Sequence, residues 1–187
     1  MKKYFIIYRP FIKFLLVFFV TYGVLSVLYN LYLSQYENNQ YPLDPFTENI
    51  SYQVKKVSNF LGWNTEIYRI SGEKWTRLVF NEKYVAKIVE GCNAISVMIL
   101  FVSFVVAFAK RFLSAFVFSV IGIVLIHMLN IFRIAVLGYF IYSRPEQTHI
   151  FHGVLFPLVI YGFVFILWVV WVRHFSGFIT RKNNAKI

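Results

Sequence analysis

Four long runs of apolar residues, separated by polar segments, dominate the chain. They cover 14–33, 93–109, 112–129 and 153–172. A hydrocarbon core about 30 Å thick needs about 20 helical residues, so each run is predicted to be a transmembrane helix. The polar segment 34–90 stands between the first run and the other three. The pattern therefore predicts four transmembrane helices with one insertion outside the membrane.

A further apolar stretch, 134–142, follows the third run and makes it too long for a simple span. One straight helix from residue 112 to the end of this stretch would be about 46 Å long at 1.5 Å per residue. We therefore expect it to tilt, to protrude or to break near Asn130 or Gly138. A stub along the outer surface, ended by Pro145, is the other arrangement that fits.

The insertion begins with a helix signal. Asp44 is a favourable N-cap residue, and Pro45 suits the first helical position. Apolar residues then recur at about helical spacing through 46–61, and Gly62 follows them. These features predict a short amphipathic helix that rests on the membrane or on the helix bundle.

Three strand signals follow this helix. The stretches 65–70, 75–80 and 83–89 are rich in β-branched and aromatic residues. Turn-forming residues at 71–72 and 81–82 separate them. The sequence therefore predicts a small β-meander between the amphipathic helix and the second apolar run.

The excess of basic residues orients the predicted helices. The chain has 19 Lys and Arg against 8 Asp and Glu, a net charge of +11. The basic residues cluster before the first run, between the second and third, and after the fourth: Lys2, Lys3, Arg9 and Lys13; Lys110 and Arg111; Arg173, Arg181, Lys182 and Lys186. The positive-inside rule places all three clusters in the cytoplasm only if the chain crosses the membrane four times. Both termini are then cytoplasmic, 34–90 and 143–152 lie outside, and binding to nucleic acid is a poor explanation of the charge.

Composition agrees with a membrane protein. Hydrophobic residues make up 59% of the chain and charged residues 14%, against roughly 45–50% and 25% in soluble domains. The predicted fold class is an all-α polytopic membrane protein with four transmembrane helices and a small outer insertion of one helix plus a β-meander. Its predicted parts are the N-terminus with the first helix (1–33), the extracytoplasmic insertion (34–90), a three-helix catalytic core (91–175) and a cytoplasmic tail (176–187).

Candidate chemistry emerges when the polar residues are placed by depth. Cys92 is the single cysteine, so it can form neither an intramolecular disulfide nor a multi-cysteine metal site, and its thiol is either inert or reactive. Cys92, Arg133 and His149 lie 18, 22 and 24 residues from the nearest basic cluster, which is about 27–36 Å if the intervening residues are helical. All three are therefore predicted at the outer membrane face. A thiol, a guanidinium and an imidazole together are the components of a cysteine acyl-transfer site.

Each of these residues also has a purely structural explanation. A lone cysteine in an apolar context is usually a small inert hydrophobe. Arg133 could extend its guanidinium to the interface, although intramembrane charges are functional by default. His127, well inside the third run, is predicted to make a satisfied polar contact rather than to take part in catalysis. The placement of three groups on one face is what favours chemistry.

Three short motifs around these residues resemble a known family. They are Glu-Gly-Cys-Asn-Ala at 90–94, Asn-Ile-Phe-Arg-Ile at 130–134 and His-Ile-Phe-His-Gly at 149–153, each at a helix boundary. Together they resemble the exosortase/archaeosortase family, and most closely the short F-type exosortases of Bacteroidetes. The resemblance implies an integral-membrane cysteine transpeptidase that cleaves a C-terminal sorting signal and joins the cargo to an acceptor. We expect neither a cofactor nor a metal.

The resemblance also implies site residues. The family's cysteine, arginine and histidine fall on Cys92, Arg133 and His149, with His152 and Asn130 as supporting candidates. His149 is preferred to His152 because the family's histidine usually precedes a glycine by four positions, as it does here. The earlier of the two histidines is also nearer the predicted aqueous loop, where a base can exchange its proton.

The reaction implied is acyl transfer at the outer face of the bacterial inner (cell) membrane. Cys92 attacks a backbone carbonyl of a substrate tail that enters laterally as a transmembrane segment. His149 deprotonates the thiol or protonates the leaving amine, and Arg133 stabilises the oxyanion or orients the substrate. An amine or water then resolves the thioester. The expected partners are exported proteins with a C-terminal transmembrane sorting signal, the lipid bilayer and an acceptor nucleophile of unknown identity.

Two other functions fit the pattern less well. The first is a non-enzymatic membrane subunit that scaffolds a secretion or polysaccharide-assembly complex. The second is a small transporter, which ranks lower because few ionisable residues lie in the middle of the predicted spans and no inverted repeat is visible. Dependence of substrate processing on the thiol would separate the enzyme from both.

Overall fold

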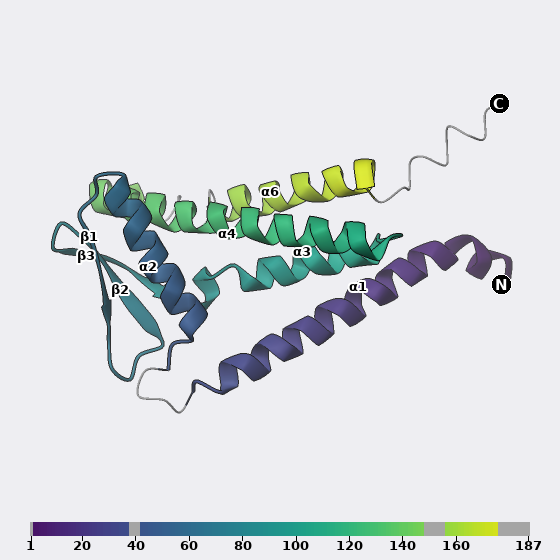
Figure 1. Ribbon diagram of the computed structural model, residues 1–187, viewed down its shortest axis with the longest axis horizontal. Helices are drawn as coiled ribbons and strands as arrows, with labels where there is room; N and C mark the ends of the chain where they lie inside the picture. Colours follow the sequence, from purple (N-terminus) through teal and green to yellow (C-terminus); the bar gives the residue numbers. More distant parts are fainter. Residues whose placement is uncertain (1, 38–41, 148–155, 176–187) are drawn as a thin grey trace.

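The computed structural model describes residues 2–37, 42–147 and 156–175 (Figure 1). The α-helices in chain order are α1 (Lys2–Ser34), α2 (Pro45–Phe60), α3 (Ile95–Ala107), α4 (Phe112–Ser143) and α6 (Phe156–Val170). The strands are β1 (Thr65–Arg69), β2 (Trp75–Phe80) and β3 (Lys83–Val89). Short helical turns are η1 (Glu90–Cys92), η2 (Pro145–Gln147) and η4 (Trp171–Phe175), the last of them a π-turn.

The molecule has two distinct ends. Helices α1, α3, α4 and α6 run along its long axis, while α2 and the sheet gather at one end (Figure 1). We call this the sheet end, comprising α2, β1–β3, η1 and the last turns of α4. The opposite end holds the start of α1, the turn between α3 and α4, and the end of α6, and we call it the basic end.

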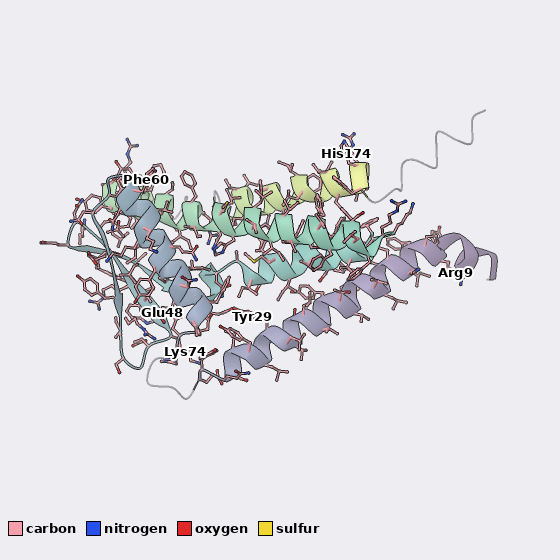
Figure 2. All side chains as sticks on the ribbon, in the orientation of Figure 1. Arg9, Tyr29, Glu48, Phe60, Lys74 and His174 are labelled. Carbon is pink, nitrogen blue, oxygen red and sulfur yellow. The ribbon has the colours of Figure 1, made fainter. Side chains whose placement is uncertain are left out.

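The described members of the three predicted basic clusters lie at one end of the molecule. Figure 2 places Arg9 of α1 and His174 of η4, directly after Arg173, at the basic end, and Glu48, Phe60 and Lys74 at the sheet end. The α3–α4 turn, with Lys110 and Arg111, is also at the basic end (Figure 1). Which side of the membrane that end faces stays a prediction.

The predicted count of four full spans is not confirmed. Among the described residues, three helical stretches are long and apolar enough to cross a membrane: Tyr8–Ser34, Phe112–Ser143 and Pro157–Phe175. Helix α3 has 13 residues, which is about 20 Å and shorter than the hydrocarbon core. It begins two residues later than predicted. Ala94, directly before its first residue, has a left-handed backbone conformation with φ at 60°, and a right-handed helix does not accommodate such a residue.

The predicted break or surface stub after the third run is wrong. Helix α4 continues without interruption past Asn130 and Gly138 and ends at Ser143. Its last turns protrude onto the sheet, where a Cβ added at Gly138 would meet Phe80 Cε2 at 2.8 Å. Because Gly138 has no side chain, the sheet can pack directly against the straight helix. This packing buries apolar residues of the sheet and of α4.

The predicted insertion is confirmed as a helix followed by a meander. Asp44 caps α2, because its Oδ1 accepts a hydrogen bond from the Thr47 amide at 2.9 Å. The strands form an antiparallel sheet in the order β1-β2-β3. Helix α2 rests on α4 and on the sheet, rather than standing away from the bundle.

Each end of the molecule has its own hydrophobic core. The sheet-end core joins α2, the sheet and α4 through Ile50, Val54, Leu78, Phe80, Ile88, Ile131, Ile134 and Ala135. The basic-end core joins α3, α4, α6 and η4 through Ala94, Met98, Phe101, Val105, Ala115, Ile126, Val164 and Trp171. The turn that carries Cys92 lies between them.

Candidate active site

Cys92 stands at the junction of the sheet and the helix bundle. It is the last residue of η1, which links the end of β3 to the start of α3. Its thiol is free and its side chain is half-buried. A thiol in this position is fixed by two neighbouring elements and is still open to a reagent or a substrate.

The residues on both sides of Cys92 are anchored to α1. Asn93 is 2% exposed, and its Nδ2 donates a hydrogen bond to the hydroxyl of Tyr29 at 2.8 Å. That hydroxyl in turn donates to Glu90 Oε1 at 2.6 Å. Figure 2 shows Tyr29 on α1, on the side of that helix that faces the bundle. One phenol therefore ties together the residue after the cysteine and the residue two positions before it.

The same asparagine is also anchored to α2 and to its own helix. Its Nδ2 donates to Thr47 Oγ1 at 2.9 Å, and its Oδ1 accepts from the Ile95 amide at 2.9 Å. Asn93 thereby uses both donors of its buried side-chain amide and accepts one bond, from the first backbone amide of α3, whose N-cap residue is Ala94. Because buried, hydrogen-bonded polar groups favour a unique geometry, this network holds the backbone that carries the thiol.

Helix α4 supplies the other candidate groups. Asn130 is fully buried, and its Nδ2 donates to the backbone carbonyl of Cys92 at 2.8 Å. Arg133, one turn further along α4, has a buried Nε without a hydrogen-bond partner among the described residues. Arg133 shares one cavity wall with Cys92 and another with Tyr161. The structure thus brings Cys92, Asn130 and Arg133 together.

Two cavities meet at Arg133. The first, of about 180 Å³, lies between β3 and α4 and includes Cys92 in its wall. The second, of about 200 Å³, lies between the start of α3, α4 and α6. Gly91, Arg133 and Pro157 line both cavities. The guanidinium-bearing Arg133 is therefore part of the wall that the two cavities share.

This arrangement suits the chemistry of acyl transfer. Cys92 supplies a free thiol, the group that acts as the nucleophile in cysteine acyl transfer. The planar guanidinium offers several donors in a fixed geometry, so it can bind a carbonyl oxygen as negative charge develops there. Within the described residues, no group of three or more His, Cys, Asp and Glu side chains could hold a metal ion.

The three histidines considered from the sequence have different outcomes. His149 and His152 lie outside the described residues, so their roles stay predictions. His127 is on α4, where its Nε2 makes a hydrogen bond with Gln53 Oε1 of α2 at 2.9 Å. This is the polar contact predicted for it, and it links the amphipathic helix to the bundle.

Sequence reasoning missed the anchors of the cysteine turn. Tyr29 and Thr47 come from two elements that precede Cys92 by 63 and 45 positions, and neither was a candidate. The one local signal was Asn93, because a side chain that favours turns and N-caps directly follows the cysteine in an otherwise apolar run.

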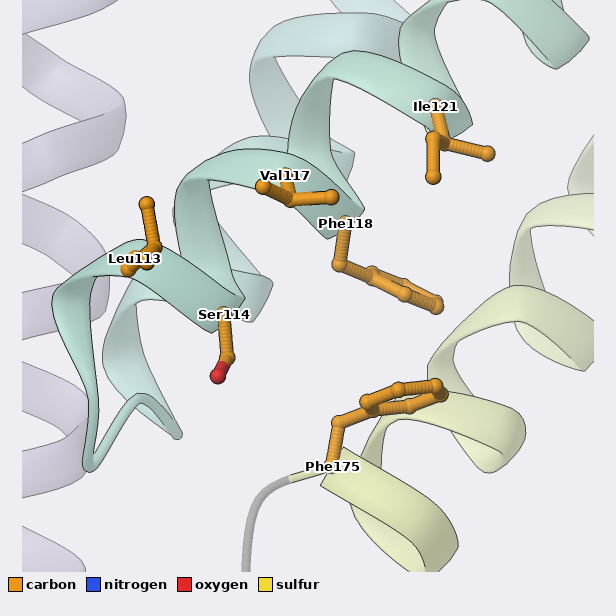
Figure 3. A pocket seen from close by; sticks show the side chains of 6 residues that line it. All are labelled: Leu113, Ser114, Val117, Phe118, Ile121 and Phe175. Atoms are coloured by element: carbon orange, nitrogen blue, oxygen red, sulfur yellow. The ribbon is translucent and has the colours of Figure 1, made fainter.

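A larger groove at the basic end carries no candidate chemistry. It has a volume of about 320 Å³ and lies between the first turns of α4 and η4 (Figure 3). Phe118 and Phe175 face one another across it, with ring centroids 5.4 Å apart. Ser114 contributes its one polar side chain. Cys92 is not among its lining residues.

The comparison with protein families agrees with the geometry around Cys92. A family model described as transmembrane exosortase matches residues 9–172, which is most of the chain and includes Cys92, Asn130 and Arg133. No curated protein and no solved structure gives a significant match. The F-type subgroup stays a prediction. The chain therefore belongs to the transmembrane exosortase family.

Proposed function

We propose that this exosortase-family protein is a cysteine-dependent sorting transpeptidase. It cleaves a C-terminal sorting signal of exported proteins at the extracytoplasmic face of the bacterial inner membrane and transfers them to an acceptor. The observation that carries the proposal is that Cys92 and Arg133, from different elements, line one cavity. A free thiol beside a cation at the mouth of a membrane bundle is what nucleophilic acyl transfer requires.

The reaction proceeds in two steps. His149 takes the proton of the Cys92 thiol, the resulting thiolate attacks a backbone carbonyl of the substrate, and Arg133 stabilises the oxyanion of the tetrahedral intermediate. The C–N bond then breaks, and the released amine takes that proton from His149, leaving a thioester on Cys92. In the second step an acceptor amine or water loses a proton to His149 and attacks the thioester carbonyl. The C–S bond breaks, and the departing sulfur takes this proton from His149, which restores the free thiol.

Trapping the thioester tests the proposal. The full-length protein is isolated from its native membrane under acidic, non-reducing conditions, and adducts of higher mass are sought. We expect a covalent adduct with an exported protein that hydroxylamine releases and that Cys92→Ala lacks. Processing of that protein should also stop in the Cys92→Ala strain, at unchanged abundance of the variant, because an alanine at this half-buried position costs little packing. Continued processing would contradict the proposal and favour the scaffold.

A matched control separates loss of the nucleophile from damage to the membrane bundle. Ser103→Ala removes a buried hydroxyl from α3 that bonds only within its own helix, to the Ile99 carbonyl at 2.7 Å. We expect Ser103→Ala to process substrate normally. Equal losses in Ser103→Ala and Cys92→Ala would mean that α3 is sensitive to any change, and the thiol would lose its special role.

A further inference from the structure

Strand β3 has one edge that is paired and one that is open. It pairs antiparallel with β2 from Phe80↔Lys83 to Trp75↔Val89, with one register shift between Leu78 and Val79. In the part of the chain that the structure describes, β3 has no second neighbour in the sheet, because the strand order is β1-β2-β3. The outer edge of β3 therefore presents backbone N–H and C=O groups that a further strand can bind.

The cavity beside Cys92 runs along this open edge. One wall is formed by Ala86, Lys87 and Ile88 of β3 and then by η1. The facing wall is the apolar side of α4, with Leu137 and Ile141 among its residues. A fourth strand added to the sheet would lie between these walls, and it would end at the thiol because β3 itself leads into η1.

The direction of the chain fixes how a substrate would lie. Strand β3 runs from the sheet end toward Cys92 (Figure 1). In the substrate, the exported part comes first in the chain and an apolar segment that enters the membrane comes last. Its chain must therefore run in the same direction as β3. Aligned parallel to β3, its residues before the scissile carbonyl occupy the first cavity. The residues after that carbonyl then enter the second cavity, which Val97 of α3 and Ile160 of α6 help to line.

The unpartnered guanidinium stands at the passage between the two cavities. Arg133 lines both, and its buried Nε lacks a partner among the described residues. An unsatisfied buried donor is costly, so a ligand that supplies an acceptor there is favoured. The carbonyl oxygen of an extended backbone supplies one at the position where the thiol can attack.

We propose that the open edge of β3 binds the substrate as an added parallel strand, with the residues before the scissile carbonyl paired to β3 and the apolar residues after it in the second cavity. This proposal rests on the proposed transpeptidase function. Recognition through main-chain hydrogen bonds depends on an extended backbone more than on particular side chains. The small wall residues Ala86 and Gly91 leave room for that backbone.

The test uses the purified full-length protein and two peptide reagents. One is acetyl-trialanyl chloromethyl ketone, whose ketone stands for the scissile carbonyl, and the other is the same reagent with one internal amide N-methylated. Iodoacetamide measures the intrinsic reactivity of the thiol. Because the chain has one cysteine, mass gain that disappears in Cys92→Ala reports labelling at that residue. We expect N-methylation to slow labelling about tenfold, the effect of losing one or two main-chain hydrogen bonds.

Cavity-filling variants give a second measurement. Ala86→Trp blocks the first cavity and should slow the unmethylated peptide reagent more than it slows iodoacetamide. Tyr68→Trp, on the exposed face of β1 at 53% exposure, is the matched control and should change neither rate.

The outcomes separate this inference from the function on which it rests. Equal labelling by the methylated and unmethylated peptides overturns docking at β3, even where substrate processing in cells depends on Cys92. If Ala86→Trp reacts abnormally with iodoacetamide, the comparison of the two peptides on the unaltered protein decides alone. Processing that continues without Cys92 overturns the function itself, and that result comes from a different experiment.

Discussion

The two ends of the molecule hold themselves together in different ways. At the sheet end, buried and half-buried polar side chains bond between elements: Tyr29, Thr47, Ser51, Thr76, Asn93 and Asn130. At the basic end, aromatic rings pack between helices, as in Phe14–Phe108 at 4.4 Å and Phe104–Trp168 at 4.3 Å between ring centroids. The candidate catalytic residues lie with the polar network and not with the larger apolar groove.

The difference follows from the solvent of each end. Lipid gives helices no hydrophobic reason to associate, so the basic end depends on close packing of large side chains. The sheet end has a separate core, and polar side chains from several elements hydrogen-bond to one another there. Changes at the sheet end should therefore alter reactivity at constant abundance, and changes at the basic end should alter stability at constant reactivity.

After loss of the thiol itself, the largest effect on substrate processing is expected from His149, which lies outside the described residues. His149→Ala should reduce substrate processing by about 10²- to 10⁴-fold, the usual contribution of a general acid–base, while His152→Ala retains activity. Processing is measured at matched protein levels in both strains. The reverse result would reassign the catalytic imidazole to His152, and loss in both would mean that His152 orients its neighbour.

The next effect tests whether Arg133 acts through its shape as well as its charge. Arg133→Lys keeps a cation but loses the planar fork of donors, so processing should fall about hundredfold, as on loss of an oxyanion donor. Arg173→Lys at the basic end is the matched control and should process substrate normally. Similar activity in Arg133→Lys and the unaltered protein would show that Arg133 contributes only its positive charge.

Local signals in the sequence predicted the insertion well. The Asp44-Pro45 pair marked the start of α2, and the β-branched stretches marked the three strands. Helical rise also placed Cys92 and Arg133 at similar depth, and they share a cavity. These features were predictable because they depend on residues that are neighbours in the sequence, or on the number of residues along one helix.

Long-range contacts could not be predicted in the same way. Gly138 reads as a helix breaker, but it allows Phe80 of the sheet to approach α4. Likewise, the bond between Tyr29 and Asn93 joins residues 64 positions apart. A tyrosine near a membrane interface is common, so nothing in the sequence distinguished this one. Such features depend on which elements meet, and only the fold decides that.

A smaller effect is expected from a glycine in the basic-end core. A Cβ added at Gly122 would clash with the ring of Phe101, which is fully buried. Gly122→Ala should therefore destabilise the protein by about 1–3 kcal/mol through overpacking. Gly23→Ala, with no atom within 4 Å of the added Cβ, is the control. Thermal aggregation in detergent measures the loss, and the rate of Cys92 alkylation should stay the same in both variants.

The smallest expected effect tests the anchor of the cysteine turn directly. Tyr29→Phe keeps the ring and removes the hydroxyl that joins Glu90 to Asn93. Each of those side chains then lacks one partner, a cost of about 1–3 kcal/mol if it stays buried, and the turn can relax. We expect processing to fall several-fold while iodoacetamide labels Cys92 at least as fast as before, because a loosened turn exposes the thiol but misplaces it.

Tyr22→Phe is the matched control for this last prediction. Tyr22 lies on the same helix, is 38% exposed and stacks on Phe18 with ring centroids 6.2 Å apart, a contact that phenylalanine preserves. Processing and alkylation should both be unchanged in this variant. If Tyr29→Phe lowers processing and alkylation together, the hydroxyl supports the folding of the turn and not the aim of the thiol. If it lowers neither, Asn93 and Asn130 hold the turn without α1, and the polar network contributes to stability alone.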